Sequence, residues 1–146
     1  MIRTSNKTPD EEQNKPFVLI IEDDPLMTRL IEKLLKSACG VHVKAAADGP
    51  EALKMLGPGT QPPVLILCDM NMPKISGLEL VEVLKAARCS SDIPIAVVSG
   101  SDDQQDATRC LAAGAFRYVL KSQIRDLLPK LVLDVVGSAS DMHRTA

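Results

Sequence analysis

The chain has 146 residues, enough for one domain whose hydrophobic core needs no disulfide to support it. Hydrophobic residues make up 45% of the chain and charged residues 25%, as in ordinary globular proteins, while only 2% are aromatic, so the core is expected to be aliphatic. The formal net charge of −2 gives no reason to expect nucleic-acid binding, and no apolar run approaches the ~18 residues that a membrane span requires.

Five short apolar runs alternate with segments of helical periodicity. Residues 1–15 come first and are polar, without the apolar stretch of a secretory signal, so we expect a disordered lead-in there. The apolar runs predict strands at 17–21, 41–46, 64–68, 93–99 and 115–120. The segments between and after them predict helices at 25–38, 50–56, 77–88, about 102–113 and 126–136. This alternation predicts an α/β domain over residues 16–137, with a parallel sheet covered by helices on both faces.

The first helix has clear start and stop signals. Asp24 is expected to cap it, with Pro25 at the first helical position and Gly40 closing it. Its apolar residues are expected to share one face of the helix. They are Leu26, Leu30, Ile31, Leu34, Leu35 and Ala38.

The last helix contains a proline. If Asp126 is its N-cap, Pro129 falls in the first turn, where no backbone N–H is required. The helix is then expected to run to about Val136 and to stop at Gly137, which leaves residues 138–146 as a flexible tail.

The four cysteines do not form a metal or disulfide pattern. None belongs to a CxxC pair, and each lies within or at the end of an apolar element, so we expect small apolar side chains in a reducing cytoplasm rather than a zinc site or a disulfide framework. They are Cys39, Cys68, Cys89 and Cys110.

Polar or charged side chains follow four of the five predicted strands. Each alone has an ordinary explanation as a helix cap, a turn residue or a surface lysine. The carboxyl ends of parallel strands share one edge, however, and ligands bind beyond that edge in such sheets. In chain order the residues are Glu22, Asp23 and Asp24, then Asp69, then Ser99, then Lys121.

This set of groups suits phosphoryl chemistry. Clustered carboxylates repel one another, and a hard divalent cation such as Mg²⁺ removes that repulsion. A carboxylate can serve as a nucleophile that forms an aspartyl phosphate. The metal and Lys121 can supply positive charge around the phosphoryl oxygens, and Ser99 can donate a hydrogen bond, with Gly100 leaving room for the approach.

Four segments resemble the receiver (CheY-like) domains of bacterial two-component response regulators. They are VLIIEDDP at 18–25, VLILCDMNMPKISGLEL at 64–80, IAVVSGS at 95–101 and GAFRYVLKS at 114–122. The resemblance covers about residues 16–136 and implies a doubly wound, flavodoxin-like (βα)5 fold with strand order 2-1-3-4-5. It also implies a cytoplasmic phosphoprotein of two-component signal transduction. The phosphoryl group would come from a sensor histidine kinase or a histidine phosphotransfer protein, and the chain would catalyse only its own phosphorylation and dephosphorylation.

By the same resemblance, Asp69 is the phosphoacceptor in a Mg²⁺-dependent reaction. The groups that would hold the metal are Glu22, Asp23, Asp69 and the backbone carbonyl of Asn71. Asp24 lies one place beyond the acidic pair and is interpreted as a helix cap.

The resemblance also implies how the switch would work. Ser99 and Lys121 match the residues that contact the phosphate, and Tyr118 matches the switch aromatic, which moves inward with the hydroxyl. An unknown effector would bind the face made by the fourth helix, the fifth strand and the fifth helix, with no nucleic acid or membrane partner for this chain alone. Ser122 departs from the family pattern, which usually has proline there.

Two other readings stay open. A haloacid-dehalogenase-type phosphatase would need Asp-x-Asp after the strand, but Asn71 stands at the second position and no cap-domain insertion is present. A receiver used as a docking or dimerising scaffold without phosphorylation is the stronger alternative, and the intact site residues weigh against it. The sequence does not separate a stand-alone protein from a piece of a longer one.

Overall fold

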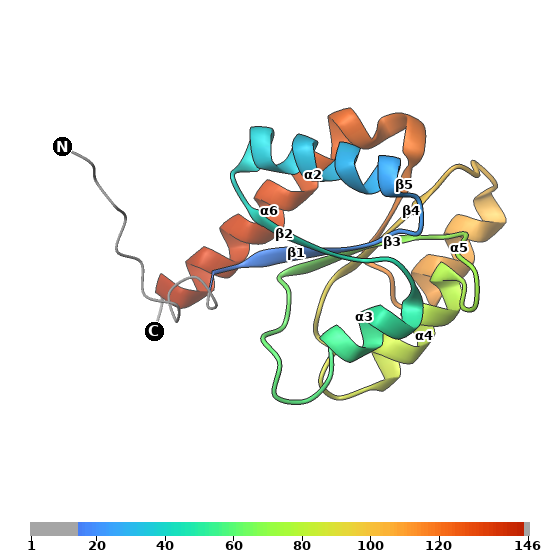
Figure 1. Ribbon diagram of the computed structural model, residues 1–146, viewed down its shortest axis with the longest axis horizontal. Helices are drawn as coiled ribbons and strands as arrows, with labels where there is room; N and C mark the ends of the chain where they lie inside the picture. Colours follow the sequence, from blue (N-terminus) through green and yellow to red (C-terminus); the bar gives the residue numbers. More distant parts are fainter. Residues whose placement is uncertain (1–14, 145–146) are drawn as a thin grey trace.

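A five-stranded parallel sheet forms the centre of the computed structural model, which describes residues 15–144, with only the backbone for 138–144 (Figure 1). The strands are β1 Phe17–Ile21, β2 His42–Ala46, β3 Leu65–Asp69, β4 Ile95–Ser99 and β5 Arg117–Leu120. The helices are α2 Pro25–Cys39, α3 Gly49–Met55, α4 Gly77–Ala86, α5 Gln104–Ala112 and α6 Ile124–Arg144, with a 3-10 turn, η1, at Lys121–Gln123.

The strand order is β2-β1-β3-β4-β5, which confirms the predicted doubly wound topology. The three inner strands are buried along their whole length, because helices cover both of their faces, and they are apolar except for their last residues in β3 and β4, Asp69 and Ser99. The outer strands β2 and β5 are only partly buried and carry polar residues such as Lys44 and Arg117. The parallel register places Ile21 beside Cys68 and Asp69 beside Val98, so the inner strands end at nearly the same level.

Two hydrophobic layers hold the helices to the sheet. Helices α2 and α6 cover one face, and α3, α4 and α5 cover the other (Figure 1). Successive residues of β1 alternate between them: Val18 and Ile20 pack on the α2 and α6 side, and Leu19 and Ile21 pack on the opposite side. This alternation is the period of two that a strand imposes on its side chains.

The ends of α2 are as predicted, but its buried face is shifted. Asp24 Oδ1 accepts a hydrogen bond from the Leu26 N–H at 3.0 Å, and Gly40 closes the helix in the left-handed conformation with φ 63°. Leu26, expected on the apolar face, is 75% exposed. It precedes the buried Ile31 by five residues, which is about 140° around a helix of ~3.6 residues per turn. Ala38, also expected on that face, is exposed in the last turn.

The prediction for the last helix was wrong at both ends. Helix α6 begins at Ile124, directly after η1, so Pro129 is a residue of the helix interior rather than of the first turn. The missing N–H leaves the carbonyl of Arg125 without its usual donor, and Arg125 is exposed to water, which can take that place. Gly137 does not end the helix, because it does not adopt the left-handed conformation of a C-terminal cap, and α6 continues to Arg144. Residues 1–14 and 145–146 lie outside the described residues, and the flexibility of 138–146 stays a prediction.

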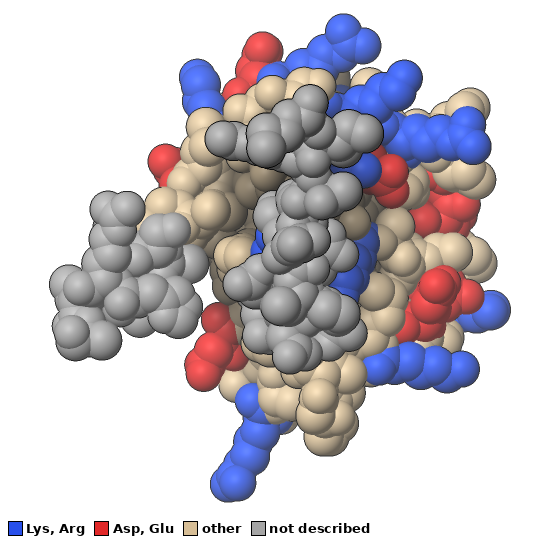
Figure 2. Space-filling model, turned by 60° about the vertical axis from the view of Figure 1, so that its left-hand side comes forward, with Lys and Arg blue, Asp and Glu red and all other residues tan. Residues whose placement is uncertain are grey.

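Charges of both signs are spread over the surface. Figure 2 shows acidic and basic side chains interspersed around one face of the molecule, in line with the near balance of 17 basic and 19 acidic residues. All four cysteines are free thiols. Within residues 15–144, no helix combines the length and the apolar character that crossing a bilayer would take.

Candidate functional site: an acidic cluster at the carboxyl edge of the sheet

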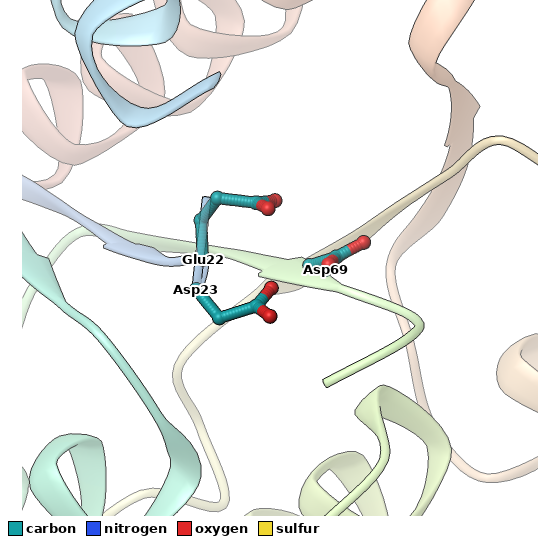
Figure 3. A group of neighbouring side chains, drawn as sticks. All are labelled: Glu22, Asp23 and Asp69. Carbon is teal, nitrogen blue, oxygen red and sulfur yellow. The ribbon is translucent and has the colours of Figure 1, made fainter. Parts of the chain in front are cut away.

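Three carboxylates meet where β1 and β3 end. Glu22 and Asp23 directly follow β1, and Asp69 is the last residue of the neighbouring strand β3. One carboxylate oxygen of each lies within 4.8 Å of the other two, and Figure 3 shows the side chains of Glu22 and Asp23 reaching toward the side where Asp69 lies. Glu22 and Asp69 are buried, whereas Asp23 is exposed, so solvent reaches the cluster at Asp23.

Lys121 brings one positive charge to this cluster from the end of β5. Its Nζ lies 3.3 Å from Asp69 Oδ1 and 3.9 Å from Glu22 Oε2. Asp69 Oδ1 is nevertheless a buried atom that accepts no hydrogen bond from any residue of the described chain, because the ammonium is in ion-pair range without the direction of a hydrogen bond. One lysine therefore serves two buried carboxylates and satisfies neither fully.

Burial, together with the excess of negative charge in this cluster, raises the pKa of Glu22. Burial, and next the negative charge of Asp69, raise the pKa of Glu22 from 4.5 to about 7, and Lys121 offsets only part of this. The Asp24 N–H donates to Glu22 Oε1 at 3.2 Å and is a further partial compensation. At neutral pH the cluster thus needs either a proton or an added cation.

Because of this raised pKa, ionised Glu22 should destabilise the folded protein in a pH-dependent way, and Glu22→Gln should remove that destabilisation. The pKa of Glu22 is higher in the folded than in the unfolded protein, so below about pH 4.5 its carboxyl group does not lower the free energy of unfolding. The loss grows between pH 4.5 and 7 and is complete above pH 7. Without divalent cations, Glu22→Gln should match the wild type near pH 4.5 and exceed its free energy of unfolding by on the order of 2 kcal/mol at pH 8. Urea unfolding at the two pH values measures this. A constant difference between the two proteins would contradict the assignment.

A hard divalent cation fits these residues. The donors are all oxygens, they lie close enough to share one ion, and one of the three residues, Asp69, has an oxygen that accepts no hydrogen bond. Asn71, predicted to contribute its backbone carbonyl, lies two residues after Asp69 in the β3–α4 loop, with an exposed side chain.

The β3–α4 loop is fixed by a close backbone contact that sequence reasoning missed. The Gly77 N–H donates to the Met70 carbonyl at 2.8 Å, so the first residue of α4 folds back onto the end of β3. A Cβ at Gly77 would lie 2.5 Å from the Asp69 carbonyl oxygen, which only glycine avoids. On the outer side of the loop, Lys74 has φ 71° and its Nζ forms an ion pair of 3.1 Å with Asp48. The Ser76-Gly77 pair before a helix was the available signal.

Ser99 and Tyr118 belong to the same edge but do not contact the acids by hydrogen bonds. Ser99, the last residue of β4, is fully buried, and its Oγ accepts from the Ser101 N–H at 3.0 Å. The Tyr118 hydroxyl donates to the Ser101 carbonyl at 2.8 Å. Over residues 15–144 no hydrogen bond links Ser99 to Asp69. Ser101, absent from the predicted site, thus connects the two predicted switch residues.

Comparisons with known proteins agree with this fold and site. The chemotaxis protein CheY homolog of Campylobacter jejuni subsp. jejuni is 32% identical over 84% of this chain and 94% of its own length. The two-component response regulator ORR2 of Oryza sativa subsp. indica is 29% identical over 71% of this chain, which spans only 54% of that relative. The crystal structure of the receiver domain of sensor histidine kinase PA1611 from Pseudomonas aeruginosa PAO1, with magnesium coordinated in its active site cleft, matches with a TM-score of 0.74 at 28% identity, over 84% of this chain and 98% of its own.

The family assignment rests on nearly the whole folded chain. The sequence pattern of the response regulator receiver domain matches residues 18–133, from β1 into α6. The chain therefore belongs to the receiver domain family of two-component response regulators.

Proposed function

We propose that this chain accepts a phosphoryl group on Asp69 and changes conformation to control a partner. One observation carries the proposal: Asp69 Oδ1 is buried and unsatisfied, with Lys121 Nζ 3.3 Å away, in a cluster where Asp69, Glu22 and Asp23 each place one oxygen within 4.8 Å of the others. The ion pair with Lys121 holds the Asp69 carboxylate in place. The site still lacks positive charge, which a transferring phosphoryl group requires and which an added cation would supply. The arrangement suits a nucleophile better than a structural ion pair.

The chemical step would be a displacement at phosphorus. An Asp69 carboxylate oxygen attacks the phosphorus, the new P–O bond forms, and the bond to the donor breaks with its electron pair leaving on the donor atom. With a phosphohistidine donor that atom is an imidazole nitrogen, and with acetyl phosphate it is an acetate oxygen. Lys121 neutralises charge on the phosphoryl oxygens, and the buried setting of Asp69 limits access of water to the product.

Glu22, Asp23, Asp69 and the backbone carbonyl of Asn71 would hold the divalent cation. When bound, Mg²⁺ supplies the positive charge that stabilises the transferring phosphoryl group. The magnesium in the PA1611 receiver domain supports this choice of metal for a chain with the same fold. Within the protein, Glu22 and Asp23 orient toward the shared site, and Lys121 keeps Asp69 in place when the metal is absent.

The partners follow from the family. Receiver domains interact with histidine kinases or phosphotransfer proteins, and we propose one of these as the phosphodonor in a cytoplasmic setting. The effector would bind the face formed by α5, β5 and α6, where the large apolar side chains of Leu111, Phe116 and Leu127 are exposed. The chain would act catalytically only on itself, in gaining and losing its own phosphoryl group.

Phosphoryl uptake should depend on Mg²⁺. Incubation with acetyl phosphate and Mg²⁺ should add one phosphoryl group, seen by intact-protein mass spectrometry, because the cluster of three acids with one lysine lacks enough positive charge alone. Excess EDTA should abolish the gain, and Ca²⁺, with its longer bonds and looser geometry, should restore it poorly. An unchanged mass with several small phosphodonors would instead favour a phosphorylation-independent scaffold.

A further inference from the structure

Ser101 is the point where the β4–α5 loop is tied to its surroundings. Its N–H donates to Ser99 Oγ at 3.0 Å, and its carbonyl accepts from the Tyr118 hydroxyl at 2.8 Å. Its own hydroxyl donates to Asp106 Oδ2 at 3.0 Å and accepts from the Asp103 N–H at 3.2 Å. One residue thus joins the end of β4, the first turn of α5 and strand β5.

The position of Ser101 decides where the Ser99 hydroxyl can go. In this structure Ser99 Oγ is engaged by the N–H of its own loop. To reach a phosphoryl group on Asp69, Ser99 has to give up or stretch that hydrogen bond, which the loop resists as long as Ser101 is held. Whatever holds Ser101 therefore also holds Ser99 back.

Asp106 is the group that holds the Ser101 side chain most firmly. The hydrogen bond from a hydroxyl to a carboxylate is of the stronger, charge-assisted kind, and Asp106 is only half exposed. Asp106 does not cap α5, since Asp103 does so by accepting from the Gln105 N–H at 2.9 Å. Its contact with Ser101 is thus not part of the cap that starts the helix.

We infer that Asp106 is a positioning residue for phosphorylation: through Ser101 it keeps the Ser99 hydroxyl in a resting position away from Asp69. The inference rests on the proposed function, because it assigns Asp106 to the reaction proposed for Asp69. The Ser101–Asp106 hydrogen bond sets how easily the resting protein reaches the geometry in which Ser99 meets the phosphoryl group.

Removing this hydrogen bond should speed phosphoryl uptake. For Asp106→Ala we expect the initial rate with acetyl phosphate and Mg²⁺ to rise about fivefold, the shift that losing one net hydrogen bond gives a two-state equilibrium. Asp106→Asn keeps a side-chain oxygen that accepts from the Ser101 hydroxyl, and should return the rate to within about twofold of the wild type.

A matched control separates this effect from the loss of charge. Asp102→Ala removes the same negative charge near the same end of α5, where it interacts with the helix dipole, but Asp102 is exposed and makes no hydrogen bond within residues 15–144. Its phosphorylation rate should equal that of the wild type. Equal rates for Asp106→Ala and Asp102→Ala, or an Asp106→Asn protein as fast as Asp106→Ala, would overturn the inference.

A second readout needs no phosphodonor. Tyr118 is the single tyrosine of a chain without tryptophan, so its emission reports on the hydroxyl that donates to Ser101. Asp106→Ala should change this emission in the resting protein, whereas Asp102→Ala and Asp106→Asn should not. If the wild type takes up no phosphoryl group, the proposed function fails, and the fluorescence comparison alone then shows whether Asp106 holds the loop. Unchanged emission in Asp106→Ala would show that it does not.

Discussion

Asp69→Asn is expected to abolish phosphoryl uptake completely while leaving the protein folded. The amide cannot attack phosphorus, whereas the rest of the cluster stays in place around an almost isosteric side chain. Intact-protein mass spectrometry after incubation with acetyl phosphate and Mg²⁺ should show one added phosphoryl group on the wild type and none on the variant. Because the substitution removes one of three repelling carboxylates, its free energy of unfolding should be no lower than that of the wild type.

Asp134→Asn serves as the matched control for this loss. Asp134 lies on the exposed side of α6, so the same change of chemistry there leaves the cluster untouched. The control should take up one phosphoryl group as the wild type does. Continued uptake by Asp69→Asn would place the phosphoacceptor elsewhere and would refute the central role proposed for Asp69.

Gly77→Ala is expected to have the largest effect on stability among glycine-to-alanine changes around the site. The added Cβ would lie 2.5 Å from the Asp69 carbonyl oxygen and 2.8 Å from the Met70 Cα, and both of these are backbone atoms that cannot move aside cheaply. We expect a loss of about 3 kcal/mol in the free energy of unfolding. Because the backbone that must move carries Asp69, the rate of phosphoryl uptake should fall as well. Chemical denaturation and the acetyl phosphate assay measure the two effects.

Gly137→Ala makes the same chemical change but should raise the free energy of unfolding instead of lowering it. Gly137 lies within α6, and beyond the neighbouring backbone of that helix a Cβ there meets no atom of the described residues within 4 Å. Alanine should therefore stabilise the protein by about 0.5–1 kcal/mol, the usual gain over glycine in a helix. If Gly77→Ala were as well tolerated as Gly137→Ala, the tight contact between α4 and the end of β3 would be refuted.

The sheet and the acidic cluster were predictable because their signals are local. Apolar runs such as 17–21 and 64–68 have no competing helical period, and parallel pairing then places the residues that follow them at one edge. Glu22, Asp69 and Lys121 could be expected together on that ground alone. The functional roles of these residues needed the family resemblance, since spacing does not distinguish a nucleophile from a metal ligand.

Features that depend on contacts between distant segments could not be predicted from the sequence. Pro129 and Gly137 have low helix propensity. In α6 this propensity is outweighed by the burial of apolar side chains against the sheet, those of Leu128, Leu131 and Val132. Nothing in the sequence alone tells that Ser101 accepts from Tyr118, because that bond joins residues that come together only when β5 pairs with β4.

The two outer strands carry cations that disfavour self-association of the folded protein through its sheet edges. β2 and β5 each have one side with backbone groups that no strand of the sheet pairs, which is the usual template for aggregation. β2 carries Lys44, whose ammonium lies 4.2 Å from the centre of the Phe17 ring, and β5 carries Arg117, whose guanidinium lies 4.4 Å from the centre of the Phe116 ring. A further strand could join only by desolvating these cations, which disfavours pairing of the sheet edges between molecules.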